Sequence, residues 1–210
     1  MTKLEYRKEY KELYVPKKNP VIVSVPAISF ITINGTGDPN EEQFALATGA
    51  LYSLSYAVKM SYKSDNIPKG YYDYTVFPLE GVWSLIDKSL PTTDKSNFKY
   101  KIMIRQQDFL TTDLFKRFLS ETENKKPNIY LDKIEYEEIY EGLCCQMLHL
   151  GSYDTEPKNF EMMKQFCNDN GYKRISFKHR EIYLSDPRRT EPQKLKTVLR
   201  YKVEVKSSTI

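Results

Sequence analysis

A sequence pattern that occurs twice in the same order constrains the fold of this 210-residue chain more than any other feature. Gly35-x-x-Asp38-x5-Phe44 matches Gly151-x-x-Asp154-x5-Phe160 without a gap, and Gly70-Tyr71-x8-Glu80 matches Gly171-Tyr172-x8-Glu181. The offset falls from 116 to 101 residues between the two matches, so the first copy contains a longer helix or loop. A repeat of this kind restricts the chain to folds that use one supersecondary unit more than once.

Local patterns predict the same succession of elements in each copy. The first copy has a strand over 21–34, a helix that starts after Asp38 and runs to about Lys63, and strands over 71–85 and 98–106. The second copy has a strand over 138–150, a helix over 156–170 that Gly171 ends, and strands over 172–184 and 195–205. A helix over 111–123 connects the copies.

These elements predict an α+β fold. It consists of two β-α-β-β repeats related by a pseudo-two-fold axis, with antiparallel sheets, helices on one side and a ligand groove between the halves. We expect a single domain over 1–210, with a first repeat over about 21–106, a connecting helix over about 111–123 and a second repeat over about 138–205.

The composition favours a soluble protein with a buried core. Apolar residues make up 40% of the chain and charged residues 29%, and no apolar stretch approaches the roughly 18 to 20 residues that cross a bilayer. The N-terminal segment lacks the apolar core of a secretion signal, so we expect a cytoplasmic protein without a membrane partner. A net charge of +4 is too balanced to predict nucleic-acid binding. We expect a monomer or weak dimer.

The few cysteine and histidine residues do not predict a metal centre or a disulfide framework. Cys144 and Cys145 are adjacent within an apolar run, and Cys167 is the only other cysteine, so packing in the core is the favoured interpretation. A zinc site needs more cysteine or histidine ligands at spaced positions than His149 and His179 supply. We therefore expect no metal and no cofactor.

The candidate chemistry is an aromatic cage that contains a carboxylate. The chain holds 17 Tyr, 10 Phe and one Trp, and the repeat places Glu80 and Glu181 at equivalent points of equivalent strands. Phe177, His179, Glu181 and Tyr183 share one face of a predicted strand, because side chains alternate. Such a cage attracts flat, apolar or cationic ligands. The alternative is that these aromatic residues form core pairs and that both glutamates face solvent.

His149 allows two interpretations. It is predicted either as a buried histidine with satisfied hydrogen bonds or as a pocket donor, since Gly151 and Tyr153 follow closely. A Cys–His nucleophile is disfavoured because His149 and the cysteines at 144 and 145 lie on one strand. The sequence contains no Ser-His-Asp order, nucleophile elbow, phosphate loop or nucleotide fingerprint.

Three segments resemble the GyrI-like small-molecule-binding family. They are Val25-Pro26-Ala27, His149-Leu150-Gly151-Ser152-Tyr153 and, most specifically, Glu181-Ile182-Tyr183-Leu184-Ser185-Asp186-Pro187. The resemblance extends from about Val21 to Val205. It implies the duplicated fold, and it implies that Glu181 lies in a pocket that favours lipophilic cations. The segment from Ile33 to Pro39 departs from the family's simpler loop.

The resemblance also implies candidate activities. One subgroup is similar to cyclopropanoid cyclopropyl hydrolases, which open the activated cyclopropane of DNA-alkylating compounds inside an aromatic cage. On that basis Glu181 and Tyr183 are the predicted catalytic residues, and the predicted ligand-binding residues are Trp83, Tyr71, Tyr72, Phe177, Glu80, His149 and Tyr153. The alternatives are a non-catalytic binding or sequestering protein or drug sensor, and a modulator of a partner protein such as a gyrase inhibitor-like protein. The chain resembles the stand-alone members, because we expect no DNA-reading domain before residue 21.

Overall fold

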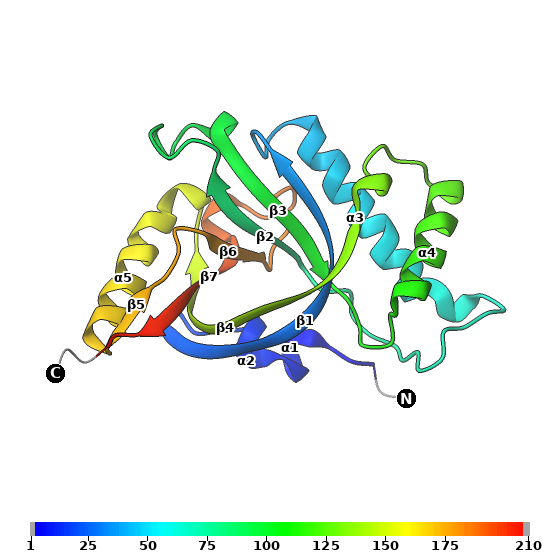
Figure 1. The fold of residues 1–210 in the computed structure, drawn as a ribbon, viewed down its shortest axis with the longest axis horizontal. Helices are drawn as coiled ribbons and strands as arrows, with labels where there is room; N and C mark the ends of the chain where they lie inside the picture. The colour runs from blue at the N-terminus through cyan, green and yellow to red at the C-terminus, as the bar shows by residue number, and fades with distance from the viewer. Residues whose placement is uncertain (1–2, 208–210) are drawn as a thin grey trace. The chain divides into compact units, whose positions relative to one another are not determined.

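A computed structural model describes residues 3–207 and shows an α+β protein (Figure 1). The chain divides into two compact units. The first comprises Ile28–Ile139 and the chain up to Glu9, and the second comprises Tyr10–Ala27 and the chain from Tyr140 onward. Among residues 3–207, no helix is both long enough and apolar enough to cross a membrane. The predicted single domain over 1–210 includes residues 1–2 and 208–210, which lie outside the described residues.

The first unit is built on an antiparallel sheet with β3 (Phe98–Arg105) at its centre. β1 (Val21–Thr36), of which the part from Ile28 lies in this unit, pairs with β3 from Phe30↔Arg105 to Thr36↔Lys99. β2 (Leu79–Leu85) pairs with β3 on the other side, and there Glu80 lies opposite Met103. The alternation in Phe98–Arg105 therefore predicted a strand correctly.

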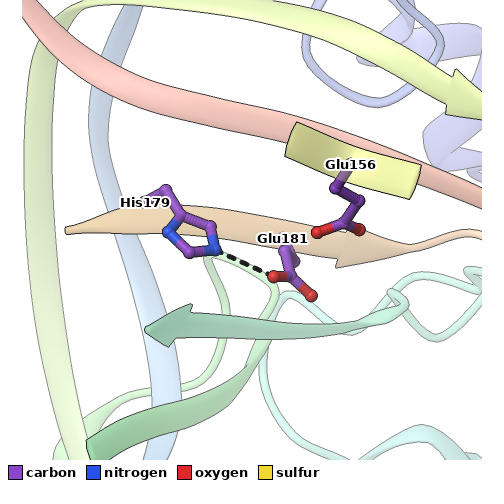
Figure 2. Close-up of side chains that lie close together, drawn as sticks. All are labelled: Glu156, His179 and Glu181. Carbon is purple, nitrogen blue, oxygen red and sulfur yellow. Dashed lines mark hydrogen bonds and ion pairs between the residues drawn. The ribbon is translucent and has the colours of Figure 1, made fainter. Parts of the chain in front are cut away.

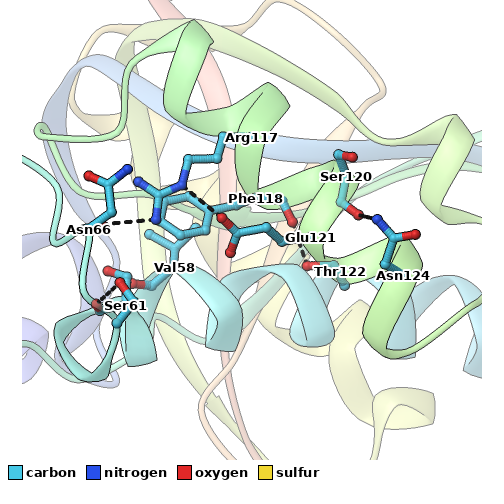
Figure 3. A network of polar contacts seen from close by, with 10 residues as sticks. Val58, Ser61, Asn66, Arg117, Phe118, Ser120, Glu121, Thr122 and Asn124 are labelled. Atoms are coloured by element: carbon cyan, nitrogen blue, oxygen red, sulfur yellow. Dashed lines mark hydrogen bonds and ion pairs between the residues drawn. The ribbon is translucent and has the colours of Figure 1, made fainter.

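Two helices of the first unit lie side by side (Figure 1). α3 (Glu42–Met60) packs a face of small and aliphatic residues into the core: Ala47, Ala50, Leu51, Leu54 and Val58 are fully buried. α4 (Thr112–Lys125) starts at Thr111, whose hydroxyl accepts a hydrogen bond from the backbone N–H of Leu114. Arg117 of α4 binds Glu121 at 2.8 Å and the backbone oxygen of Asn66 at 2.9 Å, which ties α4 to the loop that follows α3 (Figure 3).

The second unit repeats this strand pairing. β4 (Glu135–Leu150), of which the part from Tyr140 lies in this unit, and β6 (His179–Tyr183) both pair with β7 (Lys196–Val205) in antiparallel fashion. A short strand, β5 (Tyr172–Arg174), also pairs with β7. α5 (Glu156–Asp169) lies alongside β5 (Figure 1). Gly171 follows the helix at a φ of 76°, a backbone conformation that favours glycine.

The core of the second unit contains two of the three cysteines. Cys145, Met147, Met163, Cys167, Leu199, Tyr201 and Val203 form one buried cluster. Cys144 is also buried, and all three cysteines are free thiols. The prediction that they pack in the core is therefore confirmed.

An ion-pair network fixes the N-terminal part of the second unit. Glu141 binds Arg180 at 3.1 Å and Arg200 at 3.2 Å, and all three side chains are at least nine-tenths buried. Arg200 also donates to the backbone oxygen of Leu13 at 2.8 Å, which attaches α2 (Lys11–Tyr14) to the sheet. The remaining short elements are α1 (Tyr6–Glu9) and the 3-10 turns Ser61–Lys63, Lys95–Asn97, Leu131–Lys133, Tyr153–Thr155 and Pro192–Lys194.

The structure corrects two predicted strands. The strand predicted over 71–85 begins only at Leu79, because the backbone around Tyr74 pairs with Leu4: the Leu4 N–H donates to Asp73 and the Thr75 N–H donates to Leu4. The strand predicted over 172–184 is divided into β5 and β6. The guanidinium of Arg174 binds the backbone oxygens of residues 176–178 and so closes a loop between these strands.

The start of the first long helix also differs from the prediction. α3 begins at Glu42, with Glu41 before it, and not at Pro39. The Asp38 carboxylate instead accepts hydrogen bonds from the backbone and side-chain nitrogens of Asn40, which makes a local turn. The first unit has the predicted order of strand, helix, strand and strand, whereas the second has an additional short strand, β5, between its helix and β6; in each unit the last strand pairs with the other two long strands. The pseudo-two-fold axis stays a prediction.

Candidate functional site

Three ionisable side chains of the second unit come together at one point (Figure 2). Glu156 is the first residue of α5, whereas His179 and Glu181 lie on β6. His179 and Glu181 project from the same face of the strand because they are two residues apart. Pro157 in the first turn of α5 suits a helix start, since proline needs no hydrogen-bond partner there. The helix start and the strand thus bring together residues that are 25 positions apart.

Glu181 is held through both of its carboxylate oxygens. Oε1 lies 2.9 Å from Nε2 of His179, and Oε2 accepts a hydrogen bond of 2.9 Å from the hydroxyl of Tyr183. The residue is 9% exposed. Two neighbours on its own strand therefore fix the direction of this carboxylate, which suits a group that must orient a water molecule or a cation.

Glu156 is the second carboxyl group of the cluster, and it is 6% exposed. Burial, the negative charge of Glu181, a hydrogen bond with that carboxylate and the charge of Asp154 together raise the pKa of Glu156 far above its ordinary range. Its Oε1 atom has no hydrogen-bond partner among residues 3–207. Glu156 thus keeps its proton near pH 7 and places a neutral carboxylic acid beside Glu181, an arrangement that suits acid–base catalysis.

Two aromatic contacts of the same unit involve His179 of the cluster and its neighbour Tyr183. Tyr153 packs edge-on against Tyr183 with ring centroids 6.0 Å apart, and Phe160 packs edge-on against His179 at 4.8 Å. Burial and the charges of Glu181, Glu156 and Asp186 raise the pKa of Tyr153 to about 12, so its phenol keeps its proton. Tyr153 is 39% exposed and can therefore contact a ligand.

The same three residues offer atoms that divalent cations bind. One such atom from each of Glu156, His179 and Glu181 lies within 4.8 Å of the others. Nε2 of His179 is, however, directed at an oxygen of Glu181 at hydrogen-bond distance and not at a common centre (Figure 2). A metal ion held by all three residues would therefore replace the contact between His179 and Glu181.

The predicted site residues of the second unit are placed as follows. Glu181 and Tyr183 are in direct contact, and Tyr153 packs on Tyr183. His149 is 1% exposed, with Nε2 3.0 Å from the backbone oxygen of Ser152 and Nδ1 3.3 Å from Oδ1 of Asn159. Phe177 is 87% exposed in the loop between β5 and β6, and it does not share the face of Glu181. The role of each residue in ligand binding stays a prediction.

The predicted residues of the first unit lie in two aromatic clusters. Trp83 is 8% exposed and packs on Phe44, Phe98 and Tyr100. Tyr71 and Tyr72 form a second cluster with Tyr62, Tyr74 and Phe109; the Tyr71 hydroxyl binds the Lys59 backbone oxygen and the Tyr72 hydroxyl binds Gln107. Glu80 is 1% exposed on β2, the strand that corresponds to β6 in pairing order.

Sequence reasoning missed Glu156 altogether and placed His179 only on a strand face. An acid in the first turn of a helix is the ordinary response to the positive helix dipole, so the position of Glu156 carried no sign of another role. The one feature of the sequence that indicates a role for Glu156 is its position five residues after Gly151, just after the His149–Tyr153 segment that resembles the family.

Comparison with known proteins identifies a domain type. The sequence model of the GyrI-like small molecule binding domain matches residues 18–204. None of the curated proteins matches the chain. The matched range includes all three residues of the cluster and every predicted site residue.

Solved structures extend this comparison. An uncharacterized conserved protein from Listeria innocua is 35% identical, with a TM-score of 0.91 over 96% of this chain and 100% of that chain. A hydrolase from Listeria innocua is 33% identical, with a TM-score of 0.91 over 97% and 100% of the two chains. The C-terminal domain of EcmrR is 14% identical, with a TM-score of 0.56 over 89% and 98% of the two chains, and it is similar in fold alone.

Proposed function

Because the chain belongs to the GyrI-like small-molecule-binding family, we propose that it binds a flat hydrophobic or cationic small molecule and hydrolyses it. The proposed substrate is a DNA-alkylating compound with an activated cyclopropane ring, and the proposed role is detoxification in the cytoplasm. The observation that carries this proposal is the Glu181 carboxylate, which His179 and Tyr183 hold in place beside a neutral carboxyl group.

Two independent points support hydrolysis over simple binding. A carboxylate with both oxygens fixed can orient a water molecule and take a proton from it. A site that only binds a cation does not need a group that takes a proton. Two structures that are each 33% identical to the chain and match at least 96% of it are of hydrolases from Listeria innocua.

The proposed reaction needs only water. The water oxygen bonds to a ring carbon while the strained carbon–carbon bond breaks, and the electron pair of that bond passes to a conjugated oxygen of the ligand. Glu181 takes the proton that water loses. Tyr183, or the neighbouring Tyr153, donates a hydrogen bond to the oxygen that gains charge. Ring strain supplies much of the driving force, so positioning and modest acid–base assistance suffice.

The remaining predicted residues are proposed to hold the ligand. Trp83, Tyr71, Tyr72, Phe177 and Tyr153 offer aromatic faces, each worth about 0.5–2 kcal/mol to a bound cation. Glu80 and His149 are proposed to contribute polar contacts. Because Trp83 and Tyr72 also have contacts inside the first unit, their substitution tests ligand binding only if folding is checked in parallel.

A second candidate is a protein that captures its ligand without turnover. The neutral acid at Glu156 favours this candidate for uncharged ligands, because it can donate a hydrogen bond to a ligand oxygen. The two functions are separated by counting product. We would incubate the protein with a twentyfold excess of a cyclopropane-bearing alkylator, with EDTA present, and follow the ring-opened product by mass spectrometry. More than one equivalent of product per protein supports hydrolysis, whereas bound but unopened ligand identifies a capture protein.

A further inference from the structure

Glu156 and Glu181 bring two carboxyl groups close together from separate elements. Their nearest suitable oxygens are within 4.8 Å of each other, and both residues are more than nine-tenths buried. Figure 2 shows the Glu156 carboxyl group directed from the start of α5 toward Glu181 on β6. Two carboxylates this close cannot both be ionised without a large cost, so the pair holds one proton.

The groups around the pair favour keeping that proton on Glu156. His179 and Tyr183, on β6, both bind Glu181 and stabilise its ionised form. Glu156 instead faces the charge of Asp154 from the Tyr153–Thr155 turn and that of Glu181 from β6, and both oppose a second negative charge. Glu156 is therefore the acid and Glu181 the base of the pair.

Glu156 also has a free acceptor position. Its Oε1 atom is buried without a hydrogen-bond partner among the described residues. Tyr183, the donor expected from the sequence, already directs its hydroxyl at Glu181. Proton donation to a reacting molecule then requires the acidic proton of Glu156 to move from its contact with Glu181 to this unpartnered oxygen.

We propose that Glu156 is a catalytic general acid and that the Glu156–Glu181 pair hydrolyses three-membered rings whose leaving atom is a heteroatom, above all epoxides of flat aromatic compounds. This proposal rests on the proposed hydrolytic function and names a further substrate class for it. In a conjugated cyclopropane the charge develops on an oxygen remote from the attacked carbon. In an epoxide the leaving oxygen is bonded to that carbon, so an acid and a base a few ångströms apart serve both ends of one displacement.

The step balances without any further reactant. The water oxygen bonds to a ring carbon, the carbon–oxygen bond on its far side breaks, and the product is a vicinal diol. Glu156 gives its proton to the leaving oxygen while Glu181 takes one from water. The pair ends with one proton, as it began, and transfer of that proton from Glu181 to Glu156 restores the starting state.

The test compares wild type with Glu156→Gln on trans-stilbene oxide in ¹⁸O-labelled water. The amide fills the same space but has no acidic proton to give. We expect wild type to produce diol with one ¹⁸O over many turnovers and kcat/KM of E156Q to fall about 100-fold, the usual contribution of a general acid. Glu161→Gln, an exposed position on the same helix, is the matched control and leaves kcat/KM unchanged.

A second substrate separates proton donation from a structural role. An N,N-dialkyl aziridinium ion has a leaving nitrogen that needs no proton, so the loss caused by E156Q is expected to be at least tenfold smaller on it than on the epoxide. Equal losses on both substrates overturn the acid role. If E156Q does not fold, Glu156→Asp takes its place, because the shorter side chain withdraws the proton from the leaving atom.

The outcomes also separate this proposal from the proposed function. Turnover of the cyclopropane compound but not of the epoxide overturns the present inference and leaves the proposed function intact. Turnover of the epoxide alone supports the inference and removes the cyclopropane substrate. An E156Q rate within threefold of wild type on the epoxide overturns the inference even if wild type is active, and no turnover of either ring overturns both.

Discussion

The hydroxyl of Tyr183 donates a hydrogen bond of 2.9 Å to Oε2 of Glu181, two residues earlier on the same strand. The contact fixes the carboxylate from one side while His179 fixes it from the other. Tyr183 is therefore a positioning residue for Glu181 before a ligand binds, and its role as a donor to the ligand requires the hydroxyl to turn away from this carboxylate.

Removing this hydroxyl tests the positioning role. In Tyr183→Phe the ring still packs on Tyr153, but the hydrogen bond to the Glu181 carboxylate is lost, so we expect a folded protein whose melting temperature is lower by about 3–12 °C. A hydrogen bond to a charged group contributes about 1.5–3 kcal/mol, so kcat on the cyclopropane compound should fall at least tenfold while KM changes less than threefold. Steady-state kinetics with a thermal melt measure both, and an unchanged kcat would contradict the role.

The proton held by Glu156 has a cost for stability that depends on pH. The pKa of Glu156 is raised in the folded state above the ordinary value of 4.5, so between that value and its folded pKa the folded state binds a proton that the unfolded state lacks. Stability falls with rising pH in this window, by up to about 1.4 kcal/mol per pH unit. We therefore expect the free energy of unfolding of Glu156→Gln to increase relative to that of wild type as the pH rises from 5 to 8.

Urea unfolding at pH 5, 6, 7 and 8 measures this difference directly. Glu161→Gln on the same helix serves as the control, because its carboxyl group is exposed and should give no trend. A stability difference between E156Q and wild type that stays constant with pH would contradict the assignment of the shared proton.

Several elements of this fold follow from local sequence. Alternation over Phe98–Arg105 predicts the strand correctly but not its burial, because residues 102–105 are buried on both faces. Gly171 marks the end of α5 because few other residues adopt its positive φ. The strand predicted over 71–85 fails for a reason that no local pattern contains: the backbone near Tyr74 pairs with Leu4, about 70 residues earlier.

The candidate site likewise contains contacts that the local sequence predicts and one that it does not. Glu181 and Tyr183 share a face by simple alternation, so their contact follows from the sequence once β6 is recognised. The approach of Glu156 depends on how α5 packs within the second unit, which the spacing of residues does not encode. Phe177 fails to join that face because Arg174 gathers the backbone oxygens of residues 176–178 into a loop.

The buried ion pairs of Glu141 are expected to stabilise the second unit. Glu141→Gln leaves the guanidinium groups of Arg180 and Arg200 without their carboxylate, a change that costs about 3–5 kcal/mol for a buried pair. Glu204→Gln, which breaks the exposed pair with Lys173, should cost less than about 1 kcal/mol. Chemical denaturation of both variants at pH 7 tests the contrast, which equal losses would contradict.

The same network gives an acid-sensitive component of stability. Burial alone would raise the pKa of Glu141, but Arg180 and Arg200 outweigh that effect and lower it. The stabilisation is thus complete above the ordinary carboxyl pKa of 4.5 and is lost as the pH falls through the lower folded value. The difference between wild type and E141Q should shrink below about pH 4, and a difference that grows on acidification would contradict this account.

Phe177 offers the cleanest test of an aromatic ligand contact. Its side chain is 87% exposed, so Phe177→Ala should change the melting temperature by less than about 1 °C. If it covers a bound cation, the Kd for tetraphenylphosphonium should weaken about three- to tenfold, as expected for one cation–π contact. Calorimetry gives this Kd, and an unchanged value removes Phe177 from the proposed cage.

Turnover of an activated cyclopropane by wild type and by Glu181→Gln tests the central claim most directly. The amide keeps the size of the side chain but cannot take a proton from water, so we expect many equivalents of ring-opened product from wild type and at least about a hundredfold loss of kcat in the variant. Ligand binding without turnover by wild type, or equal turnover by the two proteins, would contradict the claim that Glu181 drives hydrolysis.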